Sequence, residues 1–231
     1  MTALLTPLEL EALLLSIKVG FWATLVSLPF GLGAAWLLAR CEFPGKGLLN
    51  GLIHLPLVLP PVVVGYFLLL LLGRNGPLGR ALEAAFGFTL PFTWQGAALA
   101  AAVMAFPLMV RAIRLSLDAV DRKLEAAART LGARPSGVFL AVTLPLTAPG
   151  ILVGTFLAFA RSLGEFGATI TFAANIPGET RTLPLALYAV LQQPGGEAAA
   201  LRFAILSVLV SIAALAASEL LARRVNTRQE G

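Results

Sequence analysis

The sequence is poor in the residues from which metal centres and disulfide frameworks are built. Its 231 residues include a single cysteine, Cys41, and a single histidine, His54. One cysteine excludes an intrachain disulfide and a cysteine-based metal cluster, and one histidine excludes a histidine-rich metal site. We therefore expect no metal site in this chain.

Charge is scarce as well. Charged residues make up 13% of the chain, about half of the roughly 25% found in a typical soluble domain. Hydrophobic residues make up 58%, and the mean hydropathy is +0.87. A soluble core of this size cannot bury so much apolar surface, so the excess must face a lipid bilayer. The net charge of +5 does not indicate nucleic-acid binding, because in a membrane protein the location of the charges matters more than their sum.

Sequence patterns for catalysis are missing. The chain has no G-x-x-x-x-G-K-[ST] phosphate-binding loop, and its one Gly-Lys pair, Gly45-Lys46, lacks the preceding glycine and the following hydroxyl residue. It also shows no nucleophile–base set and no paired carboxylates. We predict that the chain is not an enzyme and holds no cofactor of its own.

Five apolar stretches are each compatible with a helix that crosses a bilayer, which needs about 20 mostly apolar residues. They cover residues 10–39, 48–72, 94–110, 147–163 and 201–222. None alternates with the period of two that a barrel strand would show. The sequence therefore predicts an all-α integral membrane protein with five transmembrane helices, folded as a single transmembrane domain over residues 1–231.

The basic residues predict the orientation of these spans. If the N-terminus is outside, eleven of the seventeen basic residues lie on the inner side, four lie on the outer side, and two lie within spans. Three of the inner ones, Arg223, Arg224 and Arg228, are in the C-terminal tail. Because basic residues concentrate in cytoplasmic loops, we predict an N-out, C-in topology.

Two regions are predicted to depart from straight spans. Residues 164–197 contain two semi-apolar pieces, 166–174 and 183–191, which are too short to cross a bilayer and favour re-entrant or interfacial helices. Pro60 and Pro61, with a further proline four residues earlier, interrupt the second span. Such a break either kinks the helix for packing or aims a half-helix at an anion.

The inner loop, residues 118–145, is far more polar than its surroundings. Its residues Val120, Leu124, Ala127 and Leu131 recur at helical spacing. We expect Asp118 to cap a helix of about 12 residues that Gly132 ends, followed by a short turn over 137–142. Two interpretations stay open: the helix lies on its own bundle, or it docks in the groove of a partner.

The same loop carries a specific motif. Glu125-Ala126-Ala127 is followed at fixed intervals by Gly132 and by Val142-Thr143-Leu144-Pro145. This pattern resembles the cytoplasmic motif of importer-type ABC permeases, with Val142 where that family has isoleucine. The resemblance implies that the loop docks into a cytoplasmic ATPase, which binds the ATP and Mg, and transmits its motion. The implied coupling residues are Glu125, Ala126, Ala127, Leu131, Gly132, Leu144 and Pro145.

Further stretches narrow the resemblance. Residues 54–66 and 159–170 are similar to molybdate and sulfate permeases, and 175–182 look most like the molybdate branch. The resemblance implies a permease for molybdate in the bacterial inner membrane, supplied by a periplasmic molybdate-binding protein and driven by two ATPase subunits. Since five helices enclose little space, a second copy of the chain is expected. Sulfate, tungstate or another oxyanion remains an alternative.

Two ionisable residues near the outer end of the fourth span have two interpretations. Arg161 and Glu165 are four residues apart and share a helix face, so they form either a structural ion pair or part of the pathway or gate. The pathway candidates are Arg161, Ser162, Glu165, Thr169, Pro60 and Pro61. A gradient-driven secondary transporter and a non-transporting membrane scaffold are the alternatives from other functional classes, and reconstitution with partners would separate them.

Overall fold

Helices account for all the regular structure in residues 5–226, which the computed structural model describes. Residues 1–4 and 227–231, the ends of the predicted domain with Arg228, lie outside the described residues. The elements are α1 (Pro7–Arg40), α2 (Lys46–Val58), α3 (Pro61–Leu72), α4 (Pro77–Phe86), α5 (Trp94–Ala119), α6 (Arg122–Thr130), α7 (Pro135–Val138), the π-helical turn η1 (Phe139–Thr143), α8 (Leu144–Leu163), α9 (Gly167–Phe172), α10 (Leu183–Leu191) and α11 (Glu197–Asn226).

Four of these segments are long and apolar enough to cross a membrane. They are Pro7–Arg40, Trp94–Ala119, Pro135–Leu163 and Glu197–Ala217. The paired helices α2 and α3 together meet the same criterion but are bent by 117°. The described residues thus hold four spanning helices and one broken apolar pair, in agreement with the all-α membrane fold that the sequence predicts.

The second apolar stretch, 48–72, is therefore not one straight span. Helix α2 ends at Val58, and both Leu59 and Pro60 have extended backbone conformations. Proline has no backbone N–H and disfavours helical geometry in the residue before it, so the consecutive prolines Pro60 and Pro61 end one helix and start the next. The break was expected; its angle was not.

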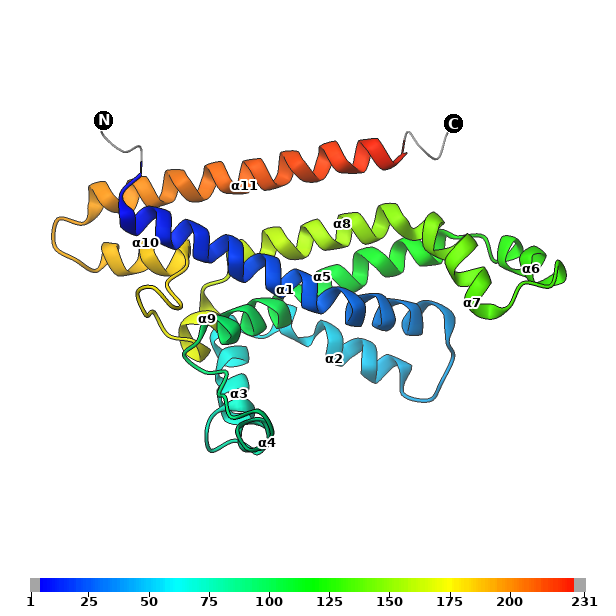
Figure 1. Ribbon diagram of the computed structural model, residues 1–231, viewed down its shortest axis with the longest axis horizontal. Helices are drawn as coiled ribbons and strands as arrows, with labels where there is room; N and C mark the ends of the chain where they lie inside the picture. The colour runs from blue at the N-terminus through cyan, green and yellow to red at the C-terminus, as the bar shows by residue number, and fades with distance from the viewer. Residues whose placement is uncertain (1–4, 227–231) are drawn as a thin grey trace.

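The long helices run side by side (Figure 1). Helix α5 packs between α1 and α8, and α11 lies over α8 and α10. One end of the molecule carries α6, α7 and the last described turn of α11, while the N-terminal end of α1 and α10 lie at the opposite end. Helices α3 and α4 project to one side. The first turn of α1 and the last described turn of α11 thus lie toward opposite ends of the molecule.

Small residues allow the central helices to approach closely. Helix α5 buries a row of alanines against its neighbours, and α8 places Gly150 and Gly154 against α5. A Cβ at Gly150 would overlap Ser116 Cβ, and one at Gly154 would lie 3.0 Å from the Met109 carbonyl oxygen. Small residues at helix contacts are typical of membrane bundles, where packing rather than the hydrophobic effect drives association.

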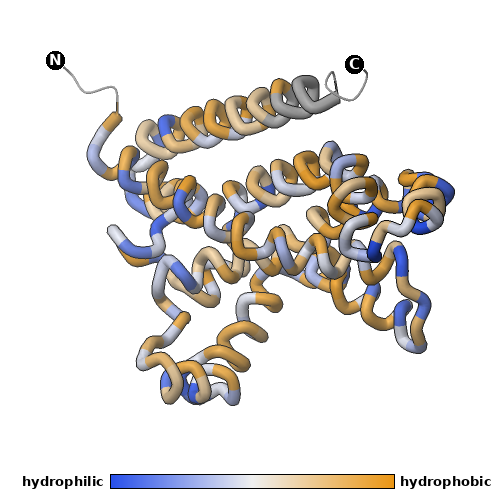
Figure 2. The backbone as a smooth tube through the Cα atoms, turned by 45° about the vertical axis from the view of Figure 1, so that its right-hand side comes forward, coloured by the Kyte–Doolittle hydropathy of each residue, from blue (hydrophilic) through white to orange (hydrophobic). Residues whose placement is uncertain are grey.

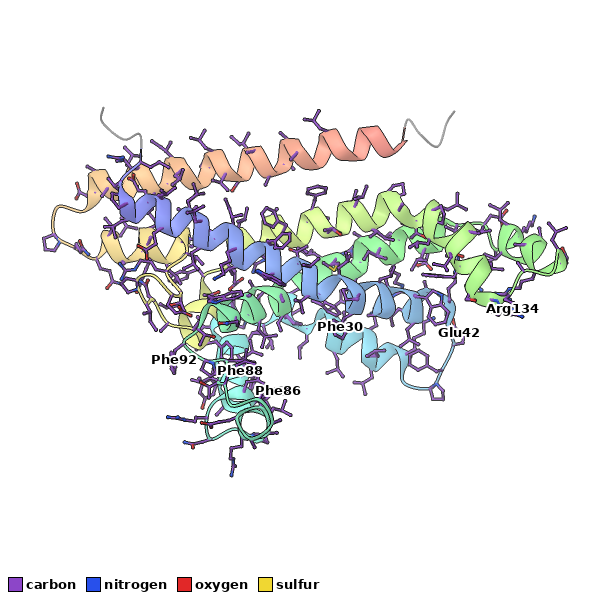
Figure 3. The ribbon with its side chains drawn as sticks, viewed as in Figure 1. Phe30, Glu42, Phe86, Phe88, Phe92 and Arg134 are labelled. Atoms are coloured by element: carbon purple, nitrogen blue, oxygen red, sulfur yellow. The ribbon has the colours of Figure 1, made fainter. Side chains whose placement is uncertain are left out.

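The outer surface of the bundle is apolar over most of its length. Figure 2 shows hydrophobic residues along all the long helices, with hydrophilic residues gathered mainly toward the ends. Large side chains such as Phe30, Val58 and Leu215 are exposed, and Phe30 points away from its helix in Figure 3. A helix that is hydrophobic all around faces lipid or a partner subunit on its uncovered side.

The predicted short segments are helices in the structure. The pieces 166–174 and 183–191 form α9 and α10, of 6 and 9 residues. Helix α9 packs against α3, where Gly65 is needed because its Cβ would lie 2.6 Å from the Ala168 carbonyl oxygen. The loop before α10 is fixed to α5 because Trp94 N donates to Glu179 Oε1 at 3.0 Å.

Candidate functional site

Helix α6 stands at the end of the molecule with α7 and the C-terminal end of α1 (Figure 1). It begins after Asp121, whose side chain accepts a hydrogen bond from Lys123 N at 2.9 Å. It is followed by Gly132, which has φ +87°. This left-handed conformation costs glycine little and other residues more, so Gly132 ends the helix as predicted.

The expected start of this helix was wrong. Asp118 does not cap it, because α5 continues to Ala119 and Asp118 forms an i,i+4 ion pair with Arg114 at 3.5 Å within α5. The helix therefore has nine residues rather than about 12. Both aspartates are acceptable caps by residue type, and the length of α5 decided between them.

The carboxylate of Glu125 faces the bundle. Its Oε1 lies 3.1 Å from Arg40 Nη2 at the end of α1 and accepts a hydrogen bond from Thr143 Oγ1 in η1 at 2.9 Å. The side chains of Arg40 and Glu125 are only 10% and 12% exposed. This trio, called the Arg40–Glu125–Thr143 junction below, joins three elements that are far apart in the sequence.

Several of the remaining loop residues are exposed on α6 and on the turn that follows it. Ala126 and Ala127 are exposed, Leu131 is 89% exposed, and a Cβ at Gly132 would meet nothing within 4 Å. The predicted apolar stripe is likewise split. Val120 is buried, whereas Leu124, Ala127 and Leu131 are exposed on the outer surface. The stripe therefore does not attach α6 to its own bundle, and the charged junction does so instead.

The segment after α6 also differs from the expected turn over 137–142. Residues Pro135–Leu163 run as one helical stretch that contains the π-turn η1, in which Leu144 N bonds to Phe139 O. Pro145, which is exposed, has no N–H to donate within this stretch, and Leu144 is half-buried. Thr143 is the last residue of this π-turn and directly precedes α8. Its hydrogen bond to Glu125 therefore connects α6 to the start of the spanning helix.

The predicted pathway residues gather where α8, α9 and α3 meet. Arg161 Nη1 lies 2.7 Å from Glu165 Oε2, and Glu165, whose side chain is 2% exposed, accepts a hydrogen bond from Ala168 N in α9 at 2.9 Å. Pro61 lies against Gly167, where a Cβ would be 2.7 Å from Pro61 Cβ. The predicted ion pair is therefore present, and the Glu165 carboxylate links Arg161 of α8 to the first turn of α9.

The hydroxyls of this region do not form a shared set of donors. Ser162 Oγ donates to its own helix at Ala158 O, at 2.8 Å. Thr169 is buried at 1% exposure, in α9. Neither hydroxyl is brought together with a guanidinium into one anion-binding cluster, so the pathway role of these residues stays a prediction.

Sequence reasoning missed two charge contacts. Glu9 is buried and pairs with Arg202 of α11, with Glu9 Oε1 2.8 Å from Arg202 Nε. The Thr6–Glu9 capping box is visible in the sequence, but the partner on α11 is not. Arg40 was counted only among the inner basic residues, because nothing local to it indicates that it pairs with Glu125.

Comparison with known proteins places this geometry in a family. Residues 27–227 match the model of the "Binding-protein-dependent transport system inner membrane component" family. The chain is 63% identical to the molybdenum transport system permease protein ModB of Escherichia coli K12 over 95% of the chain and 96% of that protein. It is 53% identical to ModB of Haemophilus influenzae over 96% of both. It is also 39% identical to the sulfate transport system permease protein CysT of Salmonella typhimurium, over 96% of the chain and 77% of that protein.

Solved structures show the same fold at low identity. A bacterial ABC transporter involved in the import of alginate matches with a TM-score of 0.76 at 14% identity, over 95% of the chain and 80% of that chain. An amino acid ABC transporter matches with a TM-score of 0.65 at 21% identity, over 94% of both. The helical order, the inner loop and these matches agree, and the chain belongs to the inner membrane components of binding-protein-dependent transport systems.

Proposed function

We propose that this chain is the channel-forming permease subunit of an ATP-driven molybdate importer in the bacterial inner membrane. The observation that carries the proposal is the 63% identity to a molybdenum transport permease over 95% of the chain. A sulfate permease is also similar, at 39% identity over 96% of the chain. The difference in identity favours molybdate over sulfate as the ion carried.

The energy for transport comes from a separate subunit. The sequence lacks the phosphate-binding loop that would hold ATP. The exposed side of α6, with Ala127, Leu131 and Gly132, is available to a cytoplasmic ATPase. This surface is small and apolar, which suits insertion of a helix into a partner's groove.

The motion of the ATPase reaches the membrane through the Arg40–Glu125–Thr143 junction. A displacement of α6 acts on α1 through Arg40 and on α8 through Thr143, because both hold the same carboxylate at 3.1 Å and 2.9 Å. Closure of two ATPase subunits would draw two such α6 helices together and turn the pathway outward, and hydrolysis would reset it. The binding protein shifts the equilibrium between the inward-facing and outward-facing states only if it binds one of them more tightly.

Two copies of the chain form the channel. Much of the large apolar surface on α1, α2 and α11 is exposed in the single chain. A two-fold dimer would cover part of it and enclose a path between the subunits. The periplasmic molybdate-binding protein delivers the dianion to the outer loops, so most of the selectivity between oxyanions lies in that partner.

Reconstitution tests the proposal. The chain is placed in vesicles with its ATPase and binding protein, and uptake of radioactive molybdate is measured with ATP, without ATP, and with an ion gradient alone. We expect uptake only with ATP and binding protein. Gradient-driven uptake without ATP would indicate a secondary transporter, and partner binding with no uptake would indicate a scaffold. Sulfate uptake that exceeds molybdate uptake would assign the chain to the sulfate branch.

A further inference from the structure

A large cleft lies at the inner end of the molecule, between α1 on one side and α6, α7 and η1 on the other. Its volume is about 1000 Å³. The residues that line it include Leu32, Trp36, Arg40, Arg122, Arg129 and Phe139. Neither the pathway residues of α8 and α9 nor the outer loops contribute to it.

The cleft is apolar along the membrane and basic at its inner end. Its wall on α1 runs from Pro29 to Cys41, a length of about 18 Å at 1.5 Å per residue. Leu32 and Trp36 provide apolar surface on this wall, and Phe139 of η1 also lines the cleft. The guanidinium groups belong to Arg40, at the end of α1, and to Arg122 and Arg129 of α6. They lie at the cytoplasmic end of the cleft. This sequence of apolar wall and basic end matches the order of acyl chain and headgroup in a phospholipid of the inner leaflet.

The charges at the inner end do not balance within the chain. Arg40 is paired with Glu125, yet its buried Nε has no hydrogen-bond partner among the described residues. Arg122 Nη2 contacts only the Ala39 carbonyl oxygen, at 3.3 Å, among the contacts described. Within residues 5–226, Arg129 has neither an ion pair nor a hydrogen bond from its side chain. Among the residues that line the cleft, Glu125 is the one carboxylate beside three guanidinium groups, and it is paired with that of Arg40.

Other acidic groups in this region are already engaged. Glu42 follows the end of α1 and pairs with Lys46 Nζ at 2.8 Å; this hydrogen bond and charge lower the pKa of Glu42, and the more distant charges of Arg122 and Arg114 lower it further. Asp118 pairs with Arg114, and Asp121 caps α6. The cleft therefore has an excess of positive charge that an external anion would neutralise.

We propose that this cleft binds an anionic phospholipid of the inner leaflet, with its phosphate between Arg122 and Arg129 and one acyl chain along Leu32 and Trp36. Guanidinium groups form charge-assisted, often bidentate hydrogen bonds to phosphate, and basic pockets between membrane helices on the cytoplasmic side suit anionic headgroups. A free tetrahedral oxyanion fits less well, because it would occupy only the basic end of the cleft and leave the apolar wall along Leu32 and Trp36 uncovered.

The bound lipid would act on the coupling helix. Glu125 and Ala126 of α6 line the same cleft as Trp36 of α1. A phosphate held by α6 on one side and an acyl chain held by α1 on the other would keep these helices together. The inference goes beyond molybdate transport, since it does not depend on which ion the permease carries.

Tryptophan quenching tests the proposal directly. The full chain is purified with ATPase subunits whose tryptophans are replaced, in a background where Trp22 and Trp94 are phenylalanine, so that Trp36 is the single reporter. It is placed in vesicles containing phosphatidylglycerol or phosphatidylcholine brominated on the acyl chains, at equal mole fraction. We expect Trp36 quenching to be at least twofold stronger with phosphatidylglycerol. Equal quenching by the two lipids would overturn the proposal.

Matched variants locate the phosphate. Arg129→Ala and Arg122→Gln should each reduce the phosphatidylglycerol quenching toward the phosphatidylcholine value. Lys123→Ala, on the same helix but outside the lining of the cleft, should leave it unchanged. An equal loss in Lys123→Ala would mean a general surface charge effect and would contradict the site. Millimolar inorganic phosphate or molybdate should not relieve the quenching; if either does, the cleft is a site for free oxyanions.

Discussion

At the scale of single residues, the Glu125 carboxylate carries the largest structural consequence. Removing one partner of a buried ion pair leaves the other charged and unsatisfied, which costs roughly 3 kcal/mol. Arg40 would be that group in Glu125→Ala, since its side chain is 10% exposed. We expect amide hydrogen exchange over α6 to accelerate by roughly 100-fold, because each 1.4 kcal/mol is a factor of ten.

Two further variants separate the contacts of this carboxylate. Glu125→Gln keeps an acceptor for Thr143 but loses the charge that pairs with Arg40, so its effect should lie between wild type and Glu125→Ala. Glu42→Gln is the matched control, because Glu42 is 86% exposed and its ion pair is with Lys46 in the turn after α1. Acceleration of α6 exchange in Glu42→Gln equal to that in Glu125→Ala would contradict a specific role for the junction.

A second prediction concerns the glycine that ends α6. Gly132 has φ +87°, and its Cβ position is open. Gly132→Val should cost about 1–2 kcal/mol in backbone strain and place a side chain on the surface that we propose docks the ATPase. We expect the variant to insert in the membrane but to lose co-purification with the ATPase.

The control for this prediction lies in the other inner turn. Gly45 has φ +88° and an equally open Cβ position, so Gly45→Val introduces the same strain away from α6. It should keep ATPase association. If both variants lose the ATPase, strain rather than the docking surface is responsible; if Gly132→Val assembles and transports normally, the docking assignment is wrong.

At the scale of elements, the close contact between α5 and α8 depends on Gly150, which has no side chain. A Cβ at Gly150 overlaps Ser116 Cβ. We expect Gly150→Ala to destabilise the bundle by about 1–3 kcal/mol through overpacking, measured by unfolding in mixed micelles. Ser116→Gly in the same chain should restore most of this loss, since it removes the atom that clashes. Additive effects of the two substitutions would show that the residues do not touch.

The inner elements also show how far local patterns extend. The end of α6 could be predicted because a glycine with positive φ is a local requirement. The start of α6 could not, because either Asp118 or Asp121 could serve as a cap and the length of α5 chose Asp121. The break after α2 follows from Pro60 and Pro61, but its angle of 117° and the π-turn before α8 could not be predicted from local patterns.

At the scale of the whole molecule, the topology gives a prediction that requires no partner. In a Cys41→Ser background, Lys123→Cys in α6 and Gln193→Cys after α10 are treated with a membrane-impermeant maleimide in intact spheroplasts. Both positions are exposed and lie at opposite ends of the molecule. We expect Gln193→Cys to react at once and Lys123→Cys to react only after permeabilisation. Labelling of Lys123→Cys in intact spheroplasts would overturn the orientation and the coupling assignment.

Composition and spacing along the chain are enough to predict the membrane environment, the helical class and the motif of residues 125–145. These depend on quantities summed along the chain, such as hydropathy, basic residues per loop and the fixed spacing from Glu125 to Pro145. The contacts of Glu125 with Arg40 and Thr143, the pairing of Glu9 with Arg202, and the cleft beside α6 arise from the packing of the helices and could not be predicted. The physical reason is that a charge in a low-dielectric bundle must find its partner across space, and no local pattern records which distant residue will be near.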